Sequence, residues 1–203
     1  YNRLGFGISS GVGFPGEASG DLTNHRGMRQ FEQATLSFGY GLSTSVLQLA
    51  RAYTALADDG ILHSVSLLTR DQDVDEQRIF SPGTARQVRK MLEEVVKKDG
   101  TAYRARVDGY RVAGKTGTVK KVGRGGYTDK KYQAVFVGMA PAGNPQLVIA
   151  VMIDEPGAGD YYGGLVAGPV FSKVMGGAMR VLGIAPDQED KIPVLLVRQG
   201  DRA

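Results

Sequence analysis

One lysine lies in a setting that fits two different kinds of chemistry. Residues Gly109–Thr116 match the phosphate-loop pattern G-x-x-x-x-G-K-S/T at every position, with Lys115 as the lysine that contacts the phosphates. The apolar run Leu147–Asp154 ends in an acid, as does the strand that carries the magnesium-binding Asp of phosphate-loop enzymes. A nucleotide-binding enzyme is therefore one hypothesis.

The residues around this octamer do not supply the elements that a phosphate loop requires. Such a loop follows an apolar strand directly and opens a helix, whose N-terminal amides hold the phosphates. Gly100–Asp108 is too polar for a buried parallel strand, and Gly117–Gly126 is broken by glycines and has no apolar stripe. The sequence thus favours a chance match to the phosphate-loop pattern.

Lys115–Thr118 also forms the Lys-Thr-Gly element of serine acyl-transferases that react with penicillin. On a strand at the edge of a sheet, the Lys115 ammonium attracts a substrate carboxylate, and Gly117 lets another backbone approach because it has no Cβ. The Thr118 hydroxyl can bind the carboxylate, and a backbone N–H near it can bind an oxyanion. On its own, a Lys-Thr-Gly more often marks the end of a surface strand, so the acyl-transferase interpretation depends on the other segments of the chain.

The composition indicates one folded core and excludes several classes of protein. With 203 residues, 42% hydrophobic and 23% charged, the chain is neither disordered nor a coiled coil, and its net charge of +4 does not require nucleic acid. The absence of cysteine excludes disulfides and thiol nucleophiles, and His25 and His63 lack the paired spacing of metal ligands. The 29 glycines indicate turns and close backbone approaches, and Gly163-Gly164 is interpreted as an approach to substrate.

Hydrophobic periodicity predicts helices around an antiparallel strand pair, whereas the first 45 residues show no period and are predicted to form surface loop. The strands are Tyr132–Ala140 and Gln146–Asp154, joined by a turn rich in proline and glycine. The predicted helices run between Ser45 and Gly60, between Ser81 and Gly100 with a stripe of Val88, Met91, Leu92, Val95 and Val96, and from Ala167 to Leu182 before Gly183.

Four segments accompany the Lys-Thr-Gly element in a fixed order. They are GFPGE at Gly13–Glu17, SFGYGLSTSVLQLARAYTALADDG at Ser37–Gly60, DGTAYRARVDGYRVAGKTGT at Asp99–Thr118 and YYGGLVAGPVF at Tyr161–Phe171. Together they resemble the class B penicillin-binding transpeptidases, and most of all the division-specific septal enzymes of Gram-negative bacteria. The resemblance covers about the first 185 residues, and four ordered segments are far more specific than one motif.

The resemblance implies an α+β fold of the serine β-lactamase and penicillin-binding transpeptidase type, in which helices cover an antiparallel sheet. It implies D,D-transpeptidation of peptidoglycan stem peptides that end in D-Ala-D-Ala, inhibition by β-lactams, and no cofactor or metal. The implied catalytic residues are Lys115, Thr116, Gly117 and Thr118. The residues implied to bind the substrate or a β-lactam are Thr118, Lys120, Tyr40, Tyr132, Tyr161 and Tyr162.

Some of these residues have an ordinary structural role as the alternative. Any one of the tyrosines can be an ordinary half-buried side chain. Lys120 is a second positive charge for a carboxylate, part of a solvated basic loop, or part of a phosphate-binding patch. The solvated loop is the commoner meaning of such a run and the preferred one. The other basic residues of that run are Lys121, Arg124, Lys130 and Lys131, and the Asp154-Glu155-Pro156 tripeptide is interpreted as a turn.

The sequence lacks the nucleophile that this chemistry needs. No serine is followed three positions later by a lysine, as the family's S-x-x-K motif requires, and its second motif, S-x-N, is missing too. In the family both motifs precede GFPGE. We therefore expect residues 1–185 to be the C-terminal portion of a transpeptidase domain, completed by an upstream segment and followed by a tail at 186–203; an inactive paralogue and a non-catalytic division scaffold are the alternatives.

The same resemblance implies a location and further partners. The substrate lies outside the inner membrane, so the protein is expected at the periplasmic face of that membrane. No run of about 18 apolar residues is present, so the expected anchor is an N-terminal helix absent from this chain. Division proteins and septal glycan-synthesis proteins are the expected partners, and nucleic acid is not.

Overall fold

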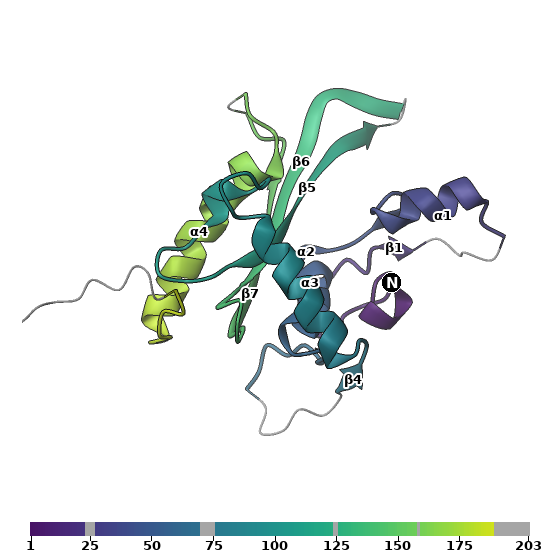
Figure 1. Cartoon of the computed structure of the whole chain (residues 1–203). Coiled ribbons are helices and arrows are strands. Elements are labelled where there is room, and N and C mark those ends of the chain that lie inside the picture. The colour runs from purple at the N-terminus through teal and green to yellow at the C-terminus, as the bar shows by residue number, and fades with distance from the viewer. Residues whose placement is uncertain (23–26, 70–75, 124–125, 158, 189–203) are drawn as a thin grey trace, which may run out of the picture.

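A three-stranded antiparallel sheet forms the centre of the molecule. The computed structural model describes residues 1–22, 27–69, 76–123, 126–157 and 159–188. Strands β5 (Ala113–Gly123), β6 (Gly126–Ala140) and β7 (Leu147–Asp154) lie in the order β5-β6-β7, so β5 is an edge strand (Figure 1). The strand pair expected from the sequence is β6–β7, and the α+β fold is confirmed.

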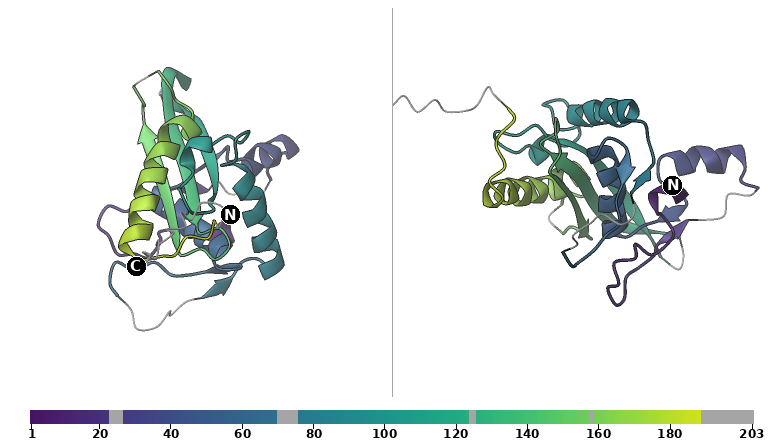
Figure 2. Two further views of the ribbon diagram at one scale, coloured as in Figure 1. Left: turned by 60° about the vertical axis from the view of Figure 1, so that its left-hand side comes forward. Right: turned by 90° about the horizontal axis from the view of Figure 1, so that it is seen from below.

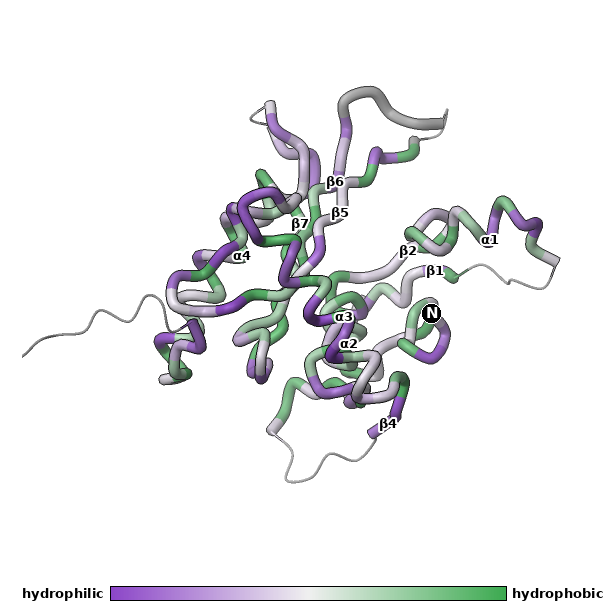
Figure 3. The backbone as a smooth tube through the Cα atoms, in the orientation of Figure 1, coloured by the Kyte–Doolittle hydropathy of each residue, from purple (hydrophilic) through white to green (hydrophobic). Residues whose placement is uncertain are grey.

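Helices cover both faces of this sheet. Helix α4 (Gly163–Val181) lies on one face, and α2 (Val46–Ala57) and α3 (Pro82–Glu94) lie on the other (Figure 2). Figure 3 shows hydrophobic residues along β7 and along the part of β6 that pairs with it, and mixed hydropathy along the three helices, as expected for helices with one buried face. Phe136 packs edge-on against Phe171 of α4 at 4.8 Å between ring centroids, whereas Met139 is buried on the opposite face.

A buried glutamine ties the N-terminal segment to α2. Ser45 caps the helix by accepting a hydrogen bond from the Gln48 backbone N–H, and the Gln48 side chain accepts one from the Ser45 N–H in return. The Gln48 amide then donates to the carbonyl oxygens of Ile8 at 2.6 Å and Ser19 at 2.7 Å. Because Gln48 is only 2% exposed, these bonds fix the path of the loop that contains GFPGE.

The N-terminal segment contains more regular structure than the sequence predicted. It holds the short 3-10 helix η1 (Asn2–Leu4), the strand pair β1 (Asp21–Leu22) and β2 (Leu42–Ser43), and helix α1 (Gln30–Ser37), where the sequence predicted loop. Helix α1 lies on the side of the molecule away from α4 (Figures 1 and 2). It buries none of its residues, and Phe31 is 78% exposed, so it has no core-facing stripe that a sequence pattern could reveal.

Three predicted boundaries differ from the observed ones. Helix α3 ends at Glu94 rather than near Gly100, and Met91 of its predicted stripe is 66% exposed. Helix α4 begins at Gly163, four residues before the predicted start, because a glycine pair there hid the helical period. In the basic run after Thr118, Lys120 and Lys121 lie in β5, which continues to Gly123, and Lys130 and Lys131 lie in β6, which starts at Gly126, where the sequence predicted loop. Arg124 lies outside the described residues. The segment between α3 and β5 contains the short 3-10 helix η2 (Tyr103–Ala105). Earlier in the chain, between α2 and α3, strands β3 (Ile61–Leu62) and β4 (Gln77–Arg78) form an antiparallel pair.

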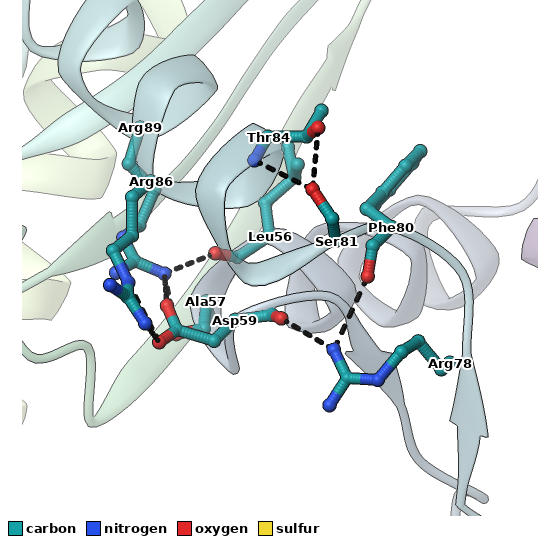
Figure 4. Close-up of polar contacts among 9 residues, drawn as sticks. All are labelled: Leu56, Ala57, Asp59, Arg78, Phe80, Ser81, Thr84, Arg86 and Arg89. Carbon is teal, nitrogen blue, oxygen red and sulfur yellow. Dashed lines mark hydrogen bonds and ion pairs between the residues drawn. The ribbon is translucent and has the colours of Figure 1, made fainter.

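A buried arginine joins α3 to the end of α2. Arg89 donates hydrogen bonds to the carbonyl oxygens of Leu56 at 2.7 Å and Ala57 at 3.2 Å, at the end of α2, and lies 2.8 Å from the Asp59 carboxylate (Figure 4). Arg86 binds the same carboxylate from solvent. The hydrogen bond from Arg86, with that from Arg89, holds the pKa of Asp59 below its usual value, so the stability it confers is lost as pH falls through the lowered pKa.

We expect Arg89→Met to lower the free energy of unfolding by about 2 kcal/mol, because two helix-end carbonyls lose their charged donor in a buried place. Urea denaturation of the protein measures this loss. Arg86→Met is the matched control: its side chain is 59% exposed and the ion pair it loses contributes roughly 0–1 kcal/mol. Equal losses in the two variants would contradict the proposed role of Arg89 in joining α2 to α3.

Candidate functional site

The Lys-Thr-Gly element lies on the open edge of the sheet, where the sequence placed it. In β5, Lys115 is opposite Val137 of β6 and Thr116 is opposite Phe136. Opposite residues of an antiparallel pair share a face, so Thr116 and Thr118 belong to the α4 face, and Lys115 and Gly117 to the α2–α3 face. A Cβ on Gly117 would touch only Val135, at 3.5 Å, so the structure offers room at this position.

The Lys115 ammonium folds back along the edge of its own strand. Its Nζ donates to the Thr116 carbonyl oxygen at 3.0 Å and to the Thr116 hydroxyl at 3.4 Å. The Thr116 hydroxyl in turn lies 3.2 Å from the hydroxyl of Thr101, which comes from the loop between α3 and η2. An exposed positive charge and two hydroxyls are thus gathered at the strand edge, a set of donors suited to a carboxylate.

The Thr118 hydroxyl is oriented by the start of α4. The Gly163 backbone N–H donates to Thr118 Oγ1 at 3.0 Å, which satisfies one of the helix's first N–H groups. A hydroxyl oxygen that accepts this bond keeps its own hydrogen for donation. Thr118 is exposed, so its O–H can be given to a ligand at the strand edge.

The glycine pair of α4 has a different role from the one the sequence suggested. Gly163 and Gly164 are both buried. A Cβ on Gly163 would come within 2.5 Å of the Gly117 carbonyl oxygen, and a Cβ on Gly164 would overlap the carbonyl oxygen of Thr101. The close backbone approach is therefore between α4 and the protein's own β5 and α3–η2 loop, not with a substrate.

Three of the four tyrosines singled out in the sequence form one group, in which Tyr162 is exposed and Tyr132 and Tyr161 are half-buried. Tyr132 of β6 stacks on Tyr161 at 4.1 Å between ring centroids and 13° between planes, and Tyr161 contacts Tyr162 at 4.5 Å. The Tyr161 hydroxyl donates to that of Tyr162 at 3.3 Å, and this bond raises the pKa of Tyr161. Tyr40 is separate: it follows α1 and packs edge-on against Phe38.

The basic run on β5 and β6 is partly neutralised by acids that the sequence pattern had assigned only to a turn. Lys121 Nζ lies 2.9 Å from Asp154 and 2.8 Å from Glu155, and Lys131 lies 3.1 Å from Glu155. Hydrogen bonds from Lys121 hold the pKa values of both carboxyls below their usual range and raise that of Lys121. Lys120 precedes a register shift in β5 and is opposite Tyr132 at the base of the tyrosine group.

The geometry contradicts the phosphate-loop interpretation. A phosphate loop must open a helix directly after its lysine. Here Lys115 and Thr116 lie inside the eleven-residue strand β5, and Leu147–Asp154 is antiparallel to its neighbour rather than a parallel strand beside the loop. The octamer is a chance match, as the surrounding sequence indicated.

None of the described His, Asp and Glu side chains form a group of three that could hold a metal ion, and His25 lies outside the described residues. In the same residues no helix is both long and apolar enough to cross a bilayer.

The start of the tail is attached to the core, since Asp187 accepts a hydrogen bond from the Arg111 N–H at 2.7 Å. Residues 189–203 lie outside the described part of the chain.

Comparison with known proteins identifies a consistent set of relatives. Residues 1–176 match the penicillin binding protein transpeptidase domain. The chain is 52% identical over 186 residues to the "Probable peptidoglycan D,D-transpeptidase PenA" of Neisseria meningitidis and 42% identical over 187 residues to the peptidoglycan D,D-transpeptidase FtsI of Escherichia coli. Each alignment covers 92% of this chain and 32% of the relative, so the chain spans about a third of the length of these relatives.

A solved structure agrees with the sequence relatives. The transpeptidase domain of Burkholderia pseudomallei penicillin-binding protein 3 superimposes with a TM-score of 0.86 at 52% identity. That alignment covers 92% of this chain and 57% of the solved domain.

Proposed function

This chain belongs to the penicillin-binding protein transpeptidase family, and from that premise we propose that it forms the carboxylate-binding part of a peptidoglycan D,D-transpeptidase. One observation carries the proposal. Lys115, Thr116 and Thr118 present an ammonium and hydroxyls along the open edge of β5, where an extended peptide ending in a carboxylate can add as a further strand.

The proposed reaction needs a serine from a segment upstream of this chain. Its Oγ attacks the penultimate D-Ala carbonyl of a stem peptide, the C–N bond to the terminal D-Ala breaks, and the serine proton leaves on the released amine. An amine of a neighbouring stem peptide then attacks the ester carbonyl. The new amide forms, and the serine recovers its proton from the attacking amine.

Within this reaction the chain binds and orients the substrate. The Lys115 ammonium attracts the terminal carboxylate, and the Thr118 hydroxyl donates to it because its oxygen already accepts from Gly163. The backbone of β5 next to Gly117 pairs with the substrate, and an N–H near Thr118 stabilises the oxyanion. β-Lactams would acylate the same serine, since they also carry an anionic group beside a reactive carbonyl.

The tyrosines and Lys120 have less direct roles in the proposal. Tyr132, Tyr161 and Tyr162 supply an aromatic surface for the acyl side of the substrate or a β-lactam substituent. Lys120 lies at the base of that surface. Tyr40 packs against Phe38 after α1 and is not part of this group, so its proposed contact with substrate is a separate one.

We further propose that the reaction serves septal wall synthesis at the periplasmic face of the inner membrane, with division and septal glycan-synthesis proteins as partners. The four ordered segments that resemble septal enzymes support this proposal. The anchor and the nucleophile are assigned to parts of the protein outside this chain.

Labelling with a fluorescent penicillin tests the proposed function. The full-length protein is expected to form a covalent adduct that survives denaturing electrophoresis, and a peptide ending in D-Ala-D-Ala is expected to compete. This chain produced alone is the control and should stay unlabelled. No adduct on the folded full-length protein would favour the scaffold alternative, whereas magnesium-dependent binding of a fluorescent ATP analogue that disappears in Lys115→Ala would revive nucleotide binding.

A further inference from the structure

The loop after α3 reaches the Lys-Thr-Gly strand through one side chain. Thr101 follows Gly100, and its hydroxyl lies 3.2 Å from that of Thr116. The two residues come from different elements, fifteen positions apart in the sequence. Sequence patterns did not single out Thr101, although it lies within a segment that resembles the septal enzymes.

The backbone around Thr101 is held in place on two sides. The Ala102 N–H donates to the Val95 carbonyl oxygen at 2.9 Å, which ties the loop to the end of α3, and Ala102 is 1% exposed. On the other side, Gly164 of α4 packs so closely that a Cβ there would overlap the Thr101 carbonyl oxygen. The Thr101 hydroxyl is therefore presented from a fixed backbone rather than from a free loop.

The Lys115 ammonium fixes one of the hydrogen-bond roles of the Thr116 hydroxyl. An ammonium is a donor only, so the Thr116 oxygen accepts from Lys115, and the direction of its own O–H is left to its remaining neighbours. When Thr101 donates to the Thr116 oxygen, the Thr116 hydrogen points away from both donors. The Thr116 hydroxyl would then accept two hydrogen bonds and donate one to a ligand at the strand edge.

We propose that Thr101 is a positioning residue that orients the Thr116 hydroxyl toward the substrate carboxylate. The proposal rests on the proposed function of the strand edge. It gives the two threonines of the element parallel support: the Gly163 N–H donates to the Thr118 oxygen. The Thr101 hydroxyl, 3.2 Å from the Thr116 oxygen, takes the matching donor role in the proposal. Because Gly164 packs on Thr101, the start of α4 supports both arrangements.

Penicillin acylation kinetics of the full-length protein test this role. Thr101→Val keeps the shape and removes the hydroxyl, and we expect the second-order acylation rate to fall about three- to tenfold, the range of one net hydrogen bond. Thr101→Ser restores the hydroxyl and should recover most of that rate. Thr54→Val is the matched control, because its hydroxyl donates to the Arg51 carbonyl oxygen within its own helix, α2.

A double-mutant cycle separates positioning from general stability. If Thr101 acts through Thr116, adding Thr101→Val to Thr116→Val lowers the acylation rate no further, although each single change does. Fully additive losses, a wild-type rate in Thr101→Val, or no recovery in Thr101→Ser would each overturn the proposal. If the wild-type protein itself is not acylated, the proposed function fails instead, so the two failures are distinguishable.

Discussion

Replacing Lys115 with alanine in the full-length protein lowers the second-order rate of penicillin acylation by about 10²–10³-fold, the typical cost of losing one strong electrostatic group at a reacting centre. Lys115 is the charged member of the Lys-Thr-Gly element, and its Nζ also orders the Thr116 carbonyl and hydroxyl oxygens. The substitution therefore removes both the charge that attracts the ligand carboxylate and a fixed donor of the strand edge. Stopped-flow or gel-based kinetics with a fluorescent penicillin measure the change.

The matched control for Lys115→Ala is Lys173→Ala. Lys173 is an exposed residue of α4, so this variant loses the same unit of charge without touching β5. Its acylation rate should stay within about twofold of the wild type, as surface charges have small effects. A near-normal rate in Lys115→Ala, in a protein that unfolds at the wild-type temperature, would contradict the assignment of the site to the edge of β5.

Replacing Gly164 with alanine lowers the free energy of unfolding by about 3 kcal/mol or more. The added Cβ would overlap the Thr101 carbonyl oxygen, and the nearest relief is a shift of backbone, not of a flexible side chain. Such a shift separates the start of α4 from the loop that carries Thr101. Thermal and urea denaturation measure the stability.

The same helix provides the control for this steric prediction. A Cβ on Gly177 would meet nothing within 4 Å, so Gly177→Ala should leave stability unchanged or raise it by roughly 0.5–1 kcal/mol, the usual advantage of alanine in a helix. Equal stability in Gly164→Ala and Gly177→Ala would contradict the close packing of α4 on the Thr101 loop.

The parts of the fold that sequence could predict are those with a strong hydrophobic period. The strand pair β6–β7 and helix α2 have such a period, and they lie close to their predicted positions. Helix α3 was also predicted from its apolar stripe, although it ends at Glu94, before the predicted Gly100. Helix α1 buries nothing, so local patterns carried little signal there. Side chains that bond across distant elements are invisible to a local pattern.

In the site too, residues adjacent in sequence could be predicted, whereas residues brought together only by the fold could not. Lys115–Thr118 could be found because its residues are adjacent in sequence, and the surrounding segments separated it from a phosphate loop that the same letters also match. Thr101 and Gly163 act on that element from other parts of the chain. Their roles depend on how α4 and the α3–η2 loop pack against β5, which no spacing rule along the sequence encodes.

We propose that this chain supplies the charge and the hydroxyl donors of an acylation site whose nucleophile lies elsewhere in the protein. Mass-spectrometric mapping of the penicillin adduct after proteolysis of the labelled full-length protein tests it most directly. We expect the adduct on a serine upstream of Tyr1 that is followed three residues later by a lysine. An adduct on any serine within residues 1–203 would contradict it.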